Sequence, residues 1–161
     1  IPIYMAAEGP KSMKRAGLYG DGLITDAKRA LMPEMRQAFE QGAREAGKDP
    51  ARMPILAELF VCTGDKEEAA RTAQLWRFTP RAWSEYVNNP DPRDIQHRAE
   101  REVPLEEAYK DWPIGNDPEV HVQAIKKLID GGVTHVFVHS AQRDQASVIE
   151  FYGRQVLPRL R

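Results

Sequence analysis

Four short apolar runs along the chain predict buried β-strands. Polar residues do not alternate regularly with apolar ones inside these runs, and such runs are typical of strands that are covered on both faces of a parallel sheet. We therefore expect a parallel sheet at the centre of the fold. The predicted strands span Ile3–Ala6, Gly22–Thr25, Ile55–Cys62 and Thr134–Val138.

Amphipathic helices are predicted between these runs. The clearest lies between Pro33, which suits a first helical turn, and Gly47, which suits a helix end. A second is expected over residues 118–129, with Asp117 as its N-cap, and a third over residues 144–156. The apolar stripe of the first helix consists of Met35, Ala38, Phe39, Gly42, Ala43 and Ala46.

The alternation of strand and helix is repeated four times, which predicts an α/β fold built from right-handed βαβ units. Two architectures satisfy this pattern. One is an open, doubly wound sheet, and the other is part of a (β/α)8 barrel. The hydrophobic periodicity does not choose between them.

Residues 76–112 interrupt the alternation. The segment contains four prolines, three tryptophans and many charged residues, and no part of it predicts a strand. Short helices are expected at residues 92–101 and 104–110. A long insertion of this kind after a barrel strand commonly builds a wall or lid of an active site, and the alternative is a plain surface excursion.

Composition adds limits on function. The 161 residues carry a formal net charge of −1, so no overall charge favours nucleic acid or an anionic membrane as a partner. The single cysteine, Cys62, excludes an internal disulfide framework and fits a reducing cytoplasm. The chain opens at Ile1 on an apolar run without an initiator methionine, from which we expect a processed or truncated product.

The ends of the chain resemble the luciferase-like flavin and deazaflavin oxidoreductases. The first strand ends in small residues, Gly9-Pro10 opens a helix, and Gly20-Asp21-Gly22 leads into the next strand. The last strand and the tail are similar to the end of the coenzyme F-420-dependent glucose-6-phosphate dehydrogenases. The segments that carry the resemblance are residues 2–10, 16–25, 132–139, 144–145 and 156–160.

The resemblance implies that the chain is half of a (β/α)8 barrel, with parallel strands five to eight and residues 76–112 as a helical insertion. A complete barrel of this type has about 250 residues or more. The family's catalytic histidine and glutamate lie in the absent half, so no catalytic residue is expected here. The implied cofactor is coenzyme F-420, with FMN as the alternative.

The resemblance places the cofactor's phosphate-bearing tail against residues Ala6, Ala7, Glu8 and Gly9. Small residues let backbone N–H groups approach an anion closely, and a helix N-terminus adds a favourable dipole. The alternative interpretation is an ordinary tight turn. Glu8 departs from the family, which commonly has a small residue there, so its carboxylate must point away from the phosphates.

The loop after the second predicted strand resembles the sugar-phosphate loop of the family. Asp26 replaces a hydroxyl residue and Arg29 replaces a lysine, while Tyr86 and Asp111 replace two cations. Two carboxylates would repel a phosphate ester, so an uncharged substrate is expected. A plain N-cap role for Asp26 remains open. The predicted substrate-binding residues are Thr25, Asp26, Lys28, Arg29, Tyr86 and Asp111.

The remaining candidate residues are mostly expected to be structural. His139 ends the last strand at the catalytic rim, where a hydrogen-bonded structural histidine is favoured over a proton shuttle. His97 and His121 are expected to face solvent on helices, and Cys62 to be a small buried residue. No histidine and carboxylate spacing indicates a metal site. Aromatic residues in the insertion are expected to form a small core or to line a pocket.

Two functions of different classes follow. The first is an F-420-dependent oxidoreductase, whose cytoplasmic parent protein transfers hydride between the deazaflavin and an alcohol or sugar-like substrate, with an FMN-dependent monooxygenase as its nearest competitor. The second is a non-catalytic half-barrel. Because a half-barrel has open strand edges, we expect either a homo-oligomer, such as a dimer, or pairing with the missing N-terminal half. Neither nucleic acid nor a membrane is an expected partner.

Overall fold

The computed structural model describes all residues from 1 to 161, and the chain divides into two compact units. The sheet unit comprises residues 1–59 and 123–139, and the helical unit comprises residues 60–122 and 140–161. The chain passes between the units inside two strands and one helix. Each unit has its own packed interior, so each is described separately.

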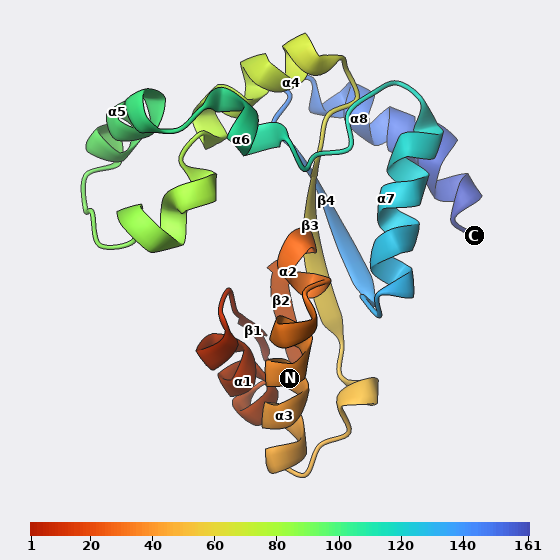
Figure 1. Cartoon of the computed structure of the whole chain (residues 1–161). Helices are drawn as coiled ribbons and strands as arrows, with labels where there is room; N and C mark the ends of the chain where they lie inside the picture. The colour runs from red at the N-terminus through yellow and green to blue at the C-terminus, as the bar shows by residue number, and fades with distance from the viewer. The chain divides into compact units, whose positions relative to one another are not determined.

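The sheet unit contains a four-stranded sheet whose strands are adjacent in chain order (Figure 1). The first three strands are parallel, with Met5 opposite Leu23 and Leu23 opposite Ile55. The N–H of Thr134 donates to the carbonyl of Ile55 at 2.9 Å, so the last strand starts beside the start of its neighbour. The predicted parallel sheet is confirmed. The expected burial on both faces holds for most of β2 and β3 but was wrong for β1 and β4, most of whose residues are exposed or half-buried, because these two strands lie at the edges of the sheet. The strands are β1 (Tyr4–Ala6), β2 (Gly22–Asp26), β3 (Ile55–Val61) and β4 (His135–Ser140).

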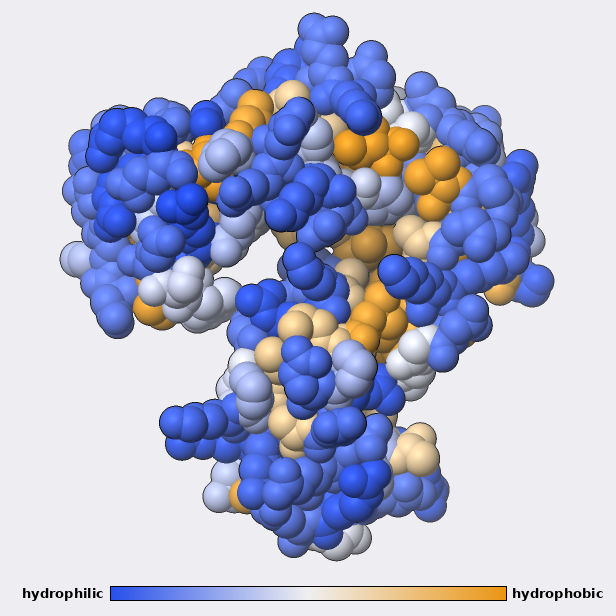
Figure 2. Space-filling view, viewed as in Figure 1, coloured by the Kyte–Doolittle hydropathy of each residue, from blue (hydrophilic) through white to orange (hydrophobic).

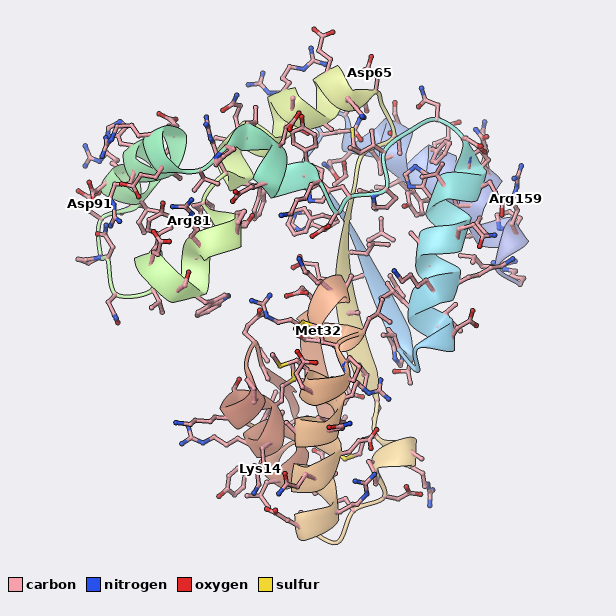
Figure 3. All side chains as sticks on the ribbon, viewed as in Figure 1. Lys14, Met32, Asp65, Arg81, Asp91 and Arg159 are labelled. Carbon is pink, nitrogen blue, oxygen red and sulfur yellow. The ribbon has the colours of Figure 1, made fainter.

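Helices α1 (Pro10–Tyr19) and α3 (Pro33–Glu45) pack tightly against each other in the sheet unit (Figure 1). Pro33 occupies the first turn of α3 as predicted, and Gly47 follows its end with a φ of 70°. Lys14, labelled in Figure 3, forms an ion pair with Glu45 at 2.8 Å between the two helices. Their outward faces are mostly hydrophilic, as Figure 2 shows for the face in view, so both helices bury one apolar stripe.

Two further helices contribute to the sheet unit. The four-residue helix α2 (Ala27–Ala30) follows β2 directly and is capped by Asp26. Helix α7 (Pro118–Asp130) begins in the helical unit and ends in the sheet unit, where Gly132 takes a φ of 84°. The side chain of Asp117 accepts the N–H of Glu119 at 2.9 Å, as expected of an N-terminal cap. The predicted helix over residues 118–129 is therefore confirmed.

The helical unit confirms both short helices expected in the insertion. Two 3₁₀ turns and the π-helical turn Ala82–Tyr86 join α4 (Lys66–Ala73) to α5 (Pro92–Glu102). Tyr86 is 3% exposed and packs in a small core with Ala99 and Val103, to which Phe78 and Ile95 add. Residues 76–112 therefore contain a small core of their own. Helices α6 (Leu105–Tyr109) and α8 (Gln145–Phe151) also belong to the helical unit.

The last predicted helix differs from the structure. The regular α-helix ends at Phe151, and Tyr152–Val156 continues as a π-helical turn. The wider turn keeps both Tyr152 and Val156 buried, and the Tyr152 hydroxyl lies 2.8 Å from Nδ1 of His121.

The expectation that His121 faces solvent was wrong. Its side chain is fully buried, and partners at both ring nitrogens offset the cost of that burial: the Tyr152 hydroxyl at Nδ1 and the Gly115 carbonyl at Nε2, 2.9 Å away. Burial lowers the pKa of His121. His97 is exposed on α5 and Cys62 is buried, both as predicted. No helix of the structure is long and apolar enough to cross a membrane.

Candidate functional site

Charged side chains gather where the parallel strands of the sheet unit end. Asp26 is the last residue of β2, and it is in register with Glu58 on β3. Glu8 lies two residues after β1, and His139 lies near the end of β4. Because the strands are parallel, these positions share the carboxyl edge of the sheet. We call Glu8, Asp26, Arg29, Glu58 and His139 the rim cluster.

Arg29 lies at the centre of the rim cluster. Its NH1 atom pairs with Oε2 of Glu8 at 2.9 Å and also with Oδ2 of Asp26. Its Nε donates to the backbone carbonyl of Glu8 at 2.8 Å. Asp26 in turn caps α2, because its Oδ1 accepts the backbone N–H of Arg29 at 2.8 Å. The N-cap alternative for Asp26 is thus realised together with an ion pair.

The environment of Glu8 changes its proton affinity. Burial, opposed by Arg29 and reinforced by the carboxyl groups of Asp26 and Glu58, raises the pKa of Glu8 to about 7. A hydrogen bond to Asp26 stabilises the protonated form. The carboxyl group of Glu8 therefore titrates near neutrality, where a small change of surroundings alters its charge.

Glu58 and His139 form a second pair in the rim cluster. Nδ1 of His139 lies 2.7 Å from Oε1 of Glu58, between neighbouring strands. Both side chains are partly exposed. The expectation that His139 is a hydrogen-bonded histidine agrees with this geometry. A carboxylate at Nδ1 fixes the orientation of the imidazole ring.

The predicted phosphate-binding loop is well ordered by its own hydrogen bonds. The N–H of Ala7 donates to Ile24 of the sheet at 3.0 Å. The N–H groups of Glu8 and Gly9 donate to the Ser12 hydroxyl at 3.2 and 3.1 Å. A Cβ atom built on Gly9 would meet nothing within 4 Å, so open space adjoins the start of α1. The Glu8 carboxylate pairs with Arg29, and binding of a phosphate by this loop stays a prediction.

The predicted substrate-binding residues in the loop after β2 differ in their exposure. Asp26 and Arg29 are partly exposed in the rim cluster, and Lys28 is exposed on α2. Thr25 is only 3% exposed, and its hydroxyl has no hydrogen-bond partner. Since successive residues of a strand point to opposite faces, Thr25 faces away from Asp26. A substrate role for Thr25 stays a prediction, and it would have to act through the position of its neighbours.

Tyr86 and Asp111 both belong to the helical unit. Tyr86 is buried in the core of the insertion, with the Arg98 guanidinium 5.1 Å from its ring centroid and its hydroxyl 3.5 Å from Glu102. Burial raises the pKa of Tyr86. These contacts explain the presence of a tyrosine at position 86 by its packing in this small core. Asp111 is exposed in the turn after α6. Contact of either residue with a substrate stays a prediction.

Two residues of this region were not anticipated from the sequence. Glu58 is the only charged residue in the apolar run of β3, and that isolation is the signal that could have identified it. Ser12 accepts two N–H groups and donates to the Gly9 carbonyl at 2.9 Å. Ser12 stands at the third helical position, where the capping box usually has glutamate or glutamine, and its side chain likewise reaches back to the N-cap backbone.

Comparison with known proteins identifies the family. The sequence profile described as luciferase-like monooxygenase matches residues 1–135. The chain belongs to the luciferase-like monooxygenase family. Within a (β/α)8 barrel of this family, the carboxyl edge of the strands is the face where active sites are built. The rim cluster of this luciferase-like chain occupies that edge.

The relatives of this luciferase-like chain include dehydrogenases. It is 43% identical over 160 residues to the F-420-dependent hydroxymycolic acid dehydrogenase of Mycobacterium tuberculosis, covering 99% of this chain and 43% of that protein. It is 32% identical over 169 residues to the F-420-dependent glucose-6-phosphate dehydrogenase of Nakamurella multipartita, covering 100% of this chain and 48% of that protein. The chain spans about half the length of the curated relatives it matches.

Solved structures are similar over the whole chain. An F-420-dependent secondary alcohol dehydrogenase in complex with an F-420–acetone adduct matches with a TM-score of 0.85 and 28% identity, covering 100% of this chain and 49% of that chain. The coenzyme F-420-dependent tetrahydromethanopterin reductase of Methanopyrus kandleri matches with a TM-score of 0.70 and 23% identity. At that identity the second match shows the fold alone.

Proposed function

We propose that this chain is the C-terminal part of a coenzyme F-420-dependent oxidoreductase, which transfers hydride between the deazaflavin and an alcohol or sugar-like substrate. The observation that carries the proposal is the 43% identity to an F-420-dependent dehydrogenase across 99% of the chain. The chain then supplies strands five to eight of the barrel. Residues 76–112 form its helical insertion, and the catalytic acid and base lie in the other half.

The loop after β1 fits the phosphate-bearing tail of the cofactor. Gly9 has an extended φ of −146°, so its backbone does not require glycine, while open space adjoins its Cα. The space lies at the N-terminus of α1, where the helix dipole favours an anion. The N–H groups of Glu8 and Gly9 would exchange the Ser12 hydroxyl for a phosphate oxygen. The residues that would hold the tail are Ala6, Ala7, Glu8 and Gly9.

The residues of this chain bind and orient the cofactor and the substrate, and they do not carry out the chemical step. When bound, coenzyme F-420 supplies the hydride-accepting carbon. The loop after β1 anchors the cofactor, and the rim cluster forms one side of the substrate space. Two carboxyl groups already pair with Arg29, so its guanidinium is engaged within the protein. This pairing supports the proposal that the substrate is uncharged. Coulomb repulsion from the carboxylates would oppose a phosphate ester.

A substitution at Gly9 tests the cofactor site. Because a Cβ atom at Gly9 meets no protein atom within 4 Å, Gly9→Val should fold normally and obstruct only a bound ligand. We expect the affinity of the complete protein for F-420 to fall by roughly tenfold or more, measured by fluorescence titration. Gly153→Val, also in open space but in the helical unit, is the matched control.

The outcomes separate the candidate functions. Unchanged F-420 affinity in Gly9→Val would exclude the proposed cofactor site. Tighter binding of FMN than of F-420 by the unsubstituted protein would favour the flavin-dependent monooxygenase. A comparison of kcat/KM for neutral alcohols, unphosphorylated sugars and glucose 6-phosphate then tests the substrate. A preference for the phosphate ester would contradict the proposal that the substrate is uncharged.

A further inference from the structure

Arg29 is the strongest potential anion-binding group of the rim, yet its guanidinium is directed at other protein groups. NH1 contacts carboxylate oxygens of Glu8 and Asp26, and Nε donates to the Glu8 carbonyl. Arg29 and its two carboxyl partners are each about one-third exposed. An anionic substrate would therefore have to displace a carboxylate to reach the guanidinium. Arginine binds carboxylate and phosphate through the same planar donors, so the two compete.

The charge of the rim also opposes an anion. With both carboxyl groups ionised, Glu8, Asp26 and Arg29 sum to one negative charge, Glu58 adds a second, and the exposed Lys28 on α2 offsets one of the two. Protonation of Glu8 brings the first three to neutrality but does not make them positive. Unit charges a few ångströms apart interact strongly near a protein surface, so this balance matters for a bound dianion.

The two carboxyl groups differ in what else they do. Asp26 has a folding role, because it caps α2 by accepting the backbone N–H of Arg29. The Glu8 carboxylate has no capping role, since the Ser12 hydroxyl accepts the N–H groups at the start of α1. It forms an ion pair with Arg29 and a hydrogen bond with Asp26, and the charge of Glu58 acts on it electrostatically. Local folding therefore does not account for an acidic residue at position 8.

We propose that Glu8 is a specificity-determining residue, which closes this rim to anionic substrates by holding Arg29 in an internal ion pair. The inference rests on the proposed function, because it names the residue that sets the substrate class of that site. Removing the charge of Glu8 should release part of the guanidinium. The rim then gains a site for a tetrahedral oxyanion such as the phosphate group of a phosphate ester.

Sulfate binding to the chain tests this inference. Sulfate is the probe because its charge is constant across the neutral range, and isothermal titration calorimetry at pH 8 gives its affinity. We expect Glu8→Gln, which keeps the shape of the side chain, to bind sulfate roughly tenfold more tightly than the unsubstituted chain. The matched control is Glu45→Gln, which removes an equal charge from the ion pair with Lys14. It should change the affinity less than twofold.

A second substitution identifies the binding group. Adding Arg29→Met to Glu8→Gln should return sulfate affinity to the original value. An unchanged affinity in Glu8→Gln would overturn the inference, as would an equal gain in Glu45→Gln or a gain that survives Arg29→Met. Circular dichroism and thermal melting show whether each variant is folded. If Glu8→Gln unfolds, Glu8→Ala takes its place with the same expected result.

Failure of this inference is distinguishable from failure of the proposed function. The sulfate titration needs no cofactor, whereas the proposed function fails if the unsubstituted complete protein does not bind F-420. In the complete enzyme, the ratio of kcat/KM for glucose 6-phosphate to that for a neutral alcohol should rise in Glu8→Gln. A ratio that stays constant while sulfate binding improves would contradict a role in substrate choice.

Discussion

Arg29 and Glu8 are separated by 21 residues in the chain, but their side chains meet at 2.9 Å because β1 and β2 are parallel neighbours. The pairing leaves Glu8 with a pKa of about 7, raised by burial against the opposing effect of Arg29. The rim cluster therefore contains a carboxyl group, that of Glu8, which titrates near neutrality, and a guanidinium group, that of Arg29, which already has carboxylate partners. The effect of each group can be measured by substituting one residue.

The stability of the chain should depend on the charge of Glu8. Between its ordinary pKa of 4.5 and about 7, folded Glu8 keeps a proton that the unfolded chain releases, so raising the pH through this window favours unfolding. We expect a loss on the order of 1 kcal/mol in the free energy of unfolding, because partial exposure screens the effect. Urea unfolding at a series of pH values measures it.

Two variants isolate the contribution of Glu8. Glu8→Gln should remove this fall in stability. Glu45→Gln should retain it, because hydrogen bonds from Lys14 and Gln41 lower the pKa of Glu45 and its effect has the opposite sign. An identical pH dependence in Glu8→Gln and the unsubstituted chain would show that the shift does not act on folding.

The buried pair of His121 and Tyr152 makes a separate residue-scale prediction. Tyr152→Phe removes the hydroxyl beside Nδ1 of His121 and leaves that nitrogen unpaired in the interior. We expect a loss of about 1–3 kcal/mol in the free energy of unfolding, measured by urea titration. Tyr19→Phe, at a tyrosine that is 71% exposed, is the control. Equal effects of the two substitutions would contradict the pairing.

At the scale of elements, the contact between α1 and α3 depends on glycine. A Cβ atom at Gly17 would lie 2.0 Å from the Phe39 carbonyl oxygen, and one at Gly42 would lie 1.9 Å from the Lys14 carbonyl oxygen. The two helix backbones therefore touch directly. Close approach requires residues without side chains here, which explains a glycine within the apolar stripe of α3.

Gly42→Ala should force the two helices apart. We expect it to lower the free energy of unfolding by about 2 kcal/mol or more, since the clash outweighs the better helix propensity of alanine, worth about 1 kcal/mol. Gly153→Ala is the control, because a Cβ atom there meets nothing within 4 Å. Chemical denaturation of both variants compares them. An unchanged free energy of unfolding in Gly42→Ala would mean that the two helices pack less closely than the structure shows.

At the scale of the whole molecule, the sheet ends in open edges at β1 and β4. Apolar side chains near these edges are exposed, with Ile3 at 63%, Phe137 at 51% and Val138 at 38%. Exposed apolar surface beside unpaired strand edges favours association. The curated relatives are about twice as long as this chain, so a missing barrel half is one candidate for the covering surface.

The isolated chain should therefore self-associate. We expect light scattering to give a mass well above 18.3 kDa at high concentration, because a second copy would cover the open edges. Phe137→Lys should lower the associated fraction, while Trp83→Lys, at an exposed aromatic of the helical unit, should not. A folded monomer of the unsubstituted chain at high concentration would contradict the expectation.

The sequence by itself indicated the four strands and most helices, because an apolar run and a helical stripe are both patterns of consecutive residues. Tertiary structure decided the order of the strands in the sheet and left β1 and β4 mostly exposed, because both depend on which strands become neighbours. The sequence also indicated Asp26 as a cap, since that signal is local. Tertiary structure alone decided the partners. Arg29 meets Glu8, His139 meets Glu58 and His121 meets Tyr152 across 21, 81 and 31 positions, respectively. No local pattern encodes such contacts, because they arise from strand register and helix packing.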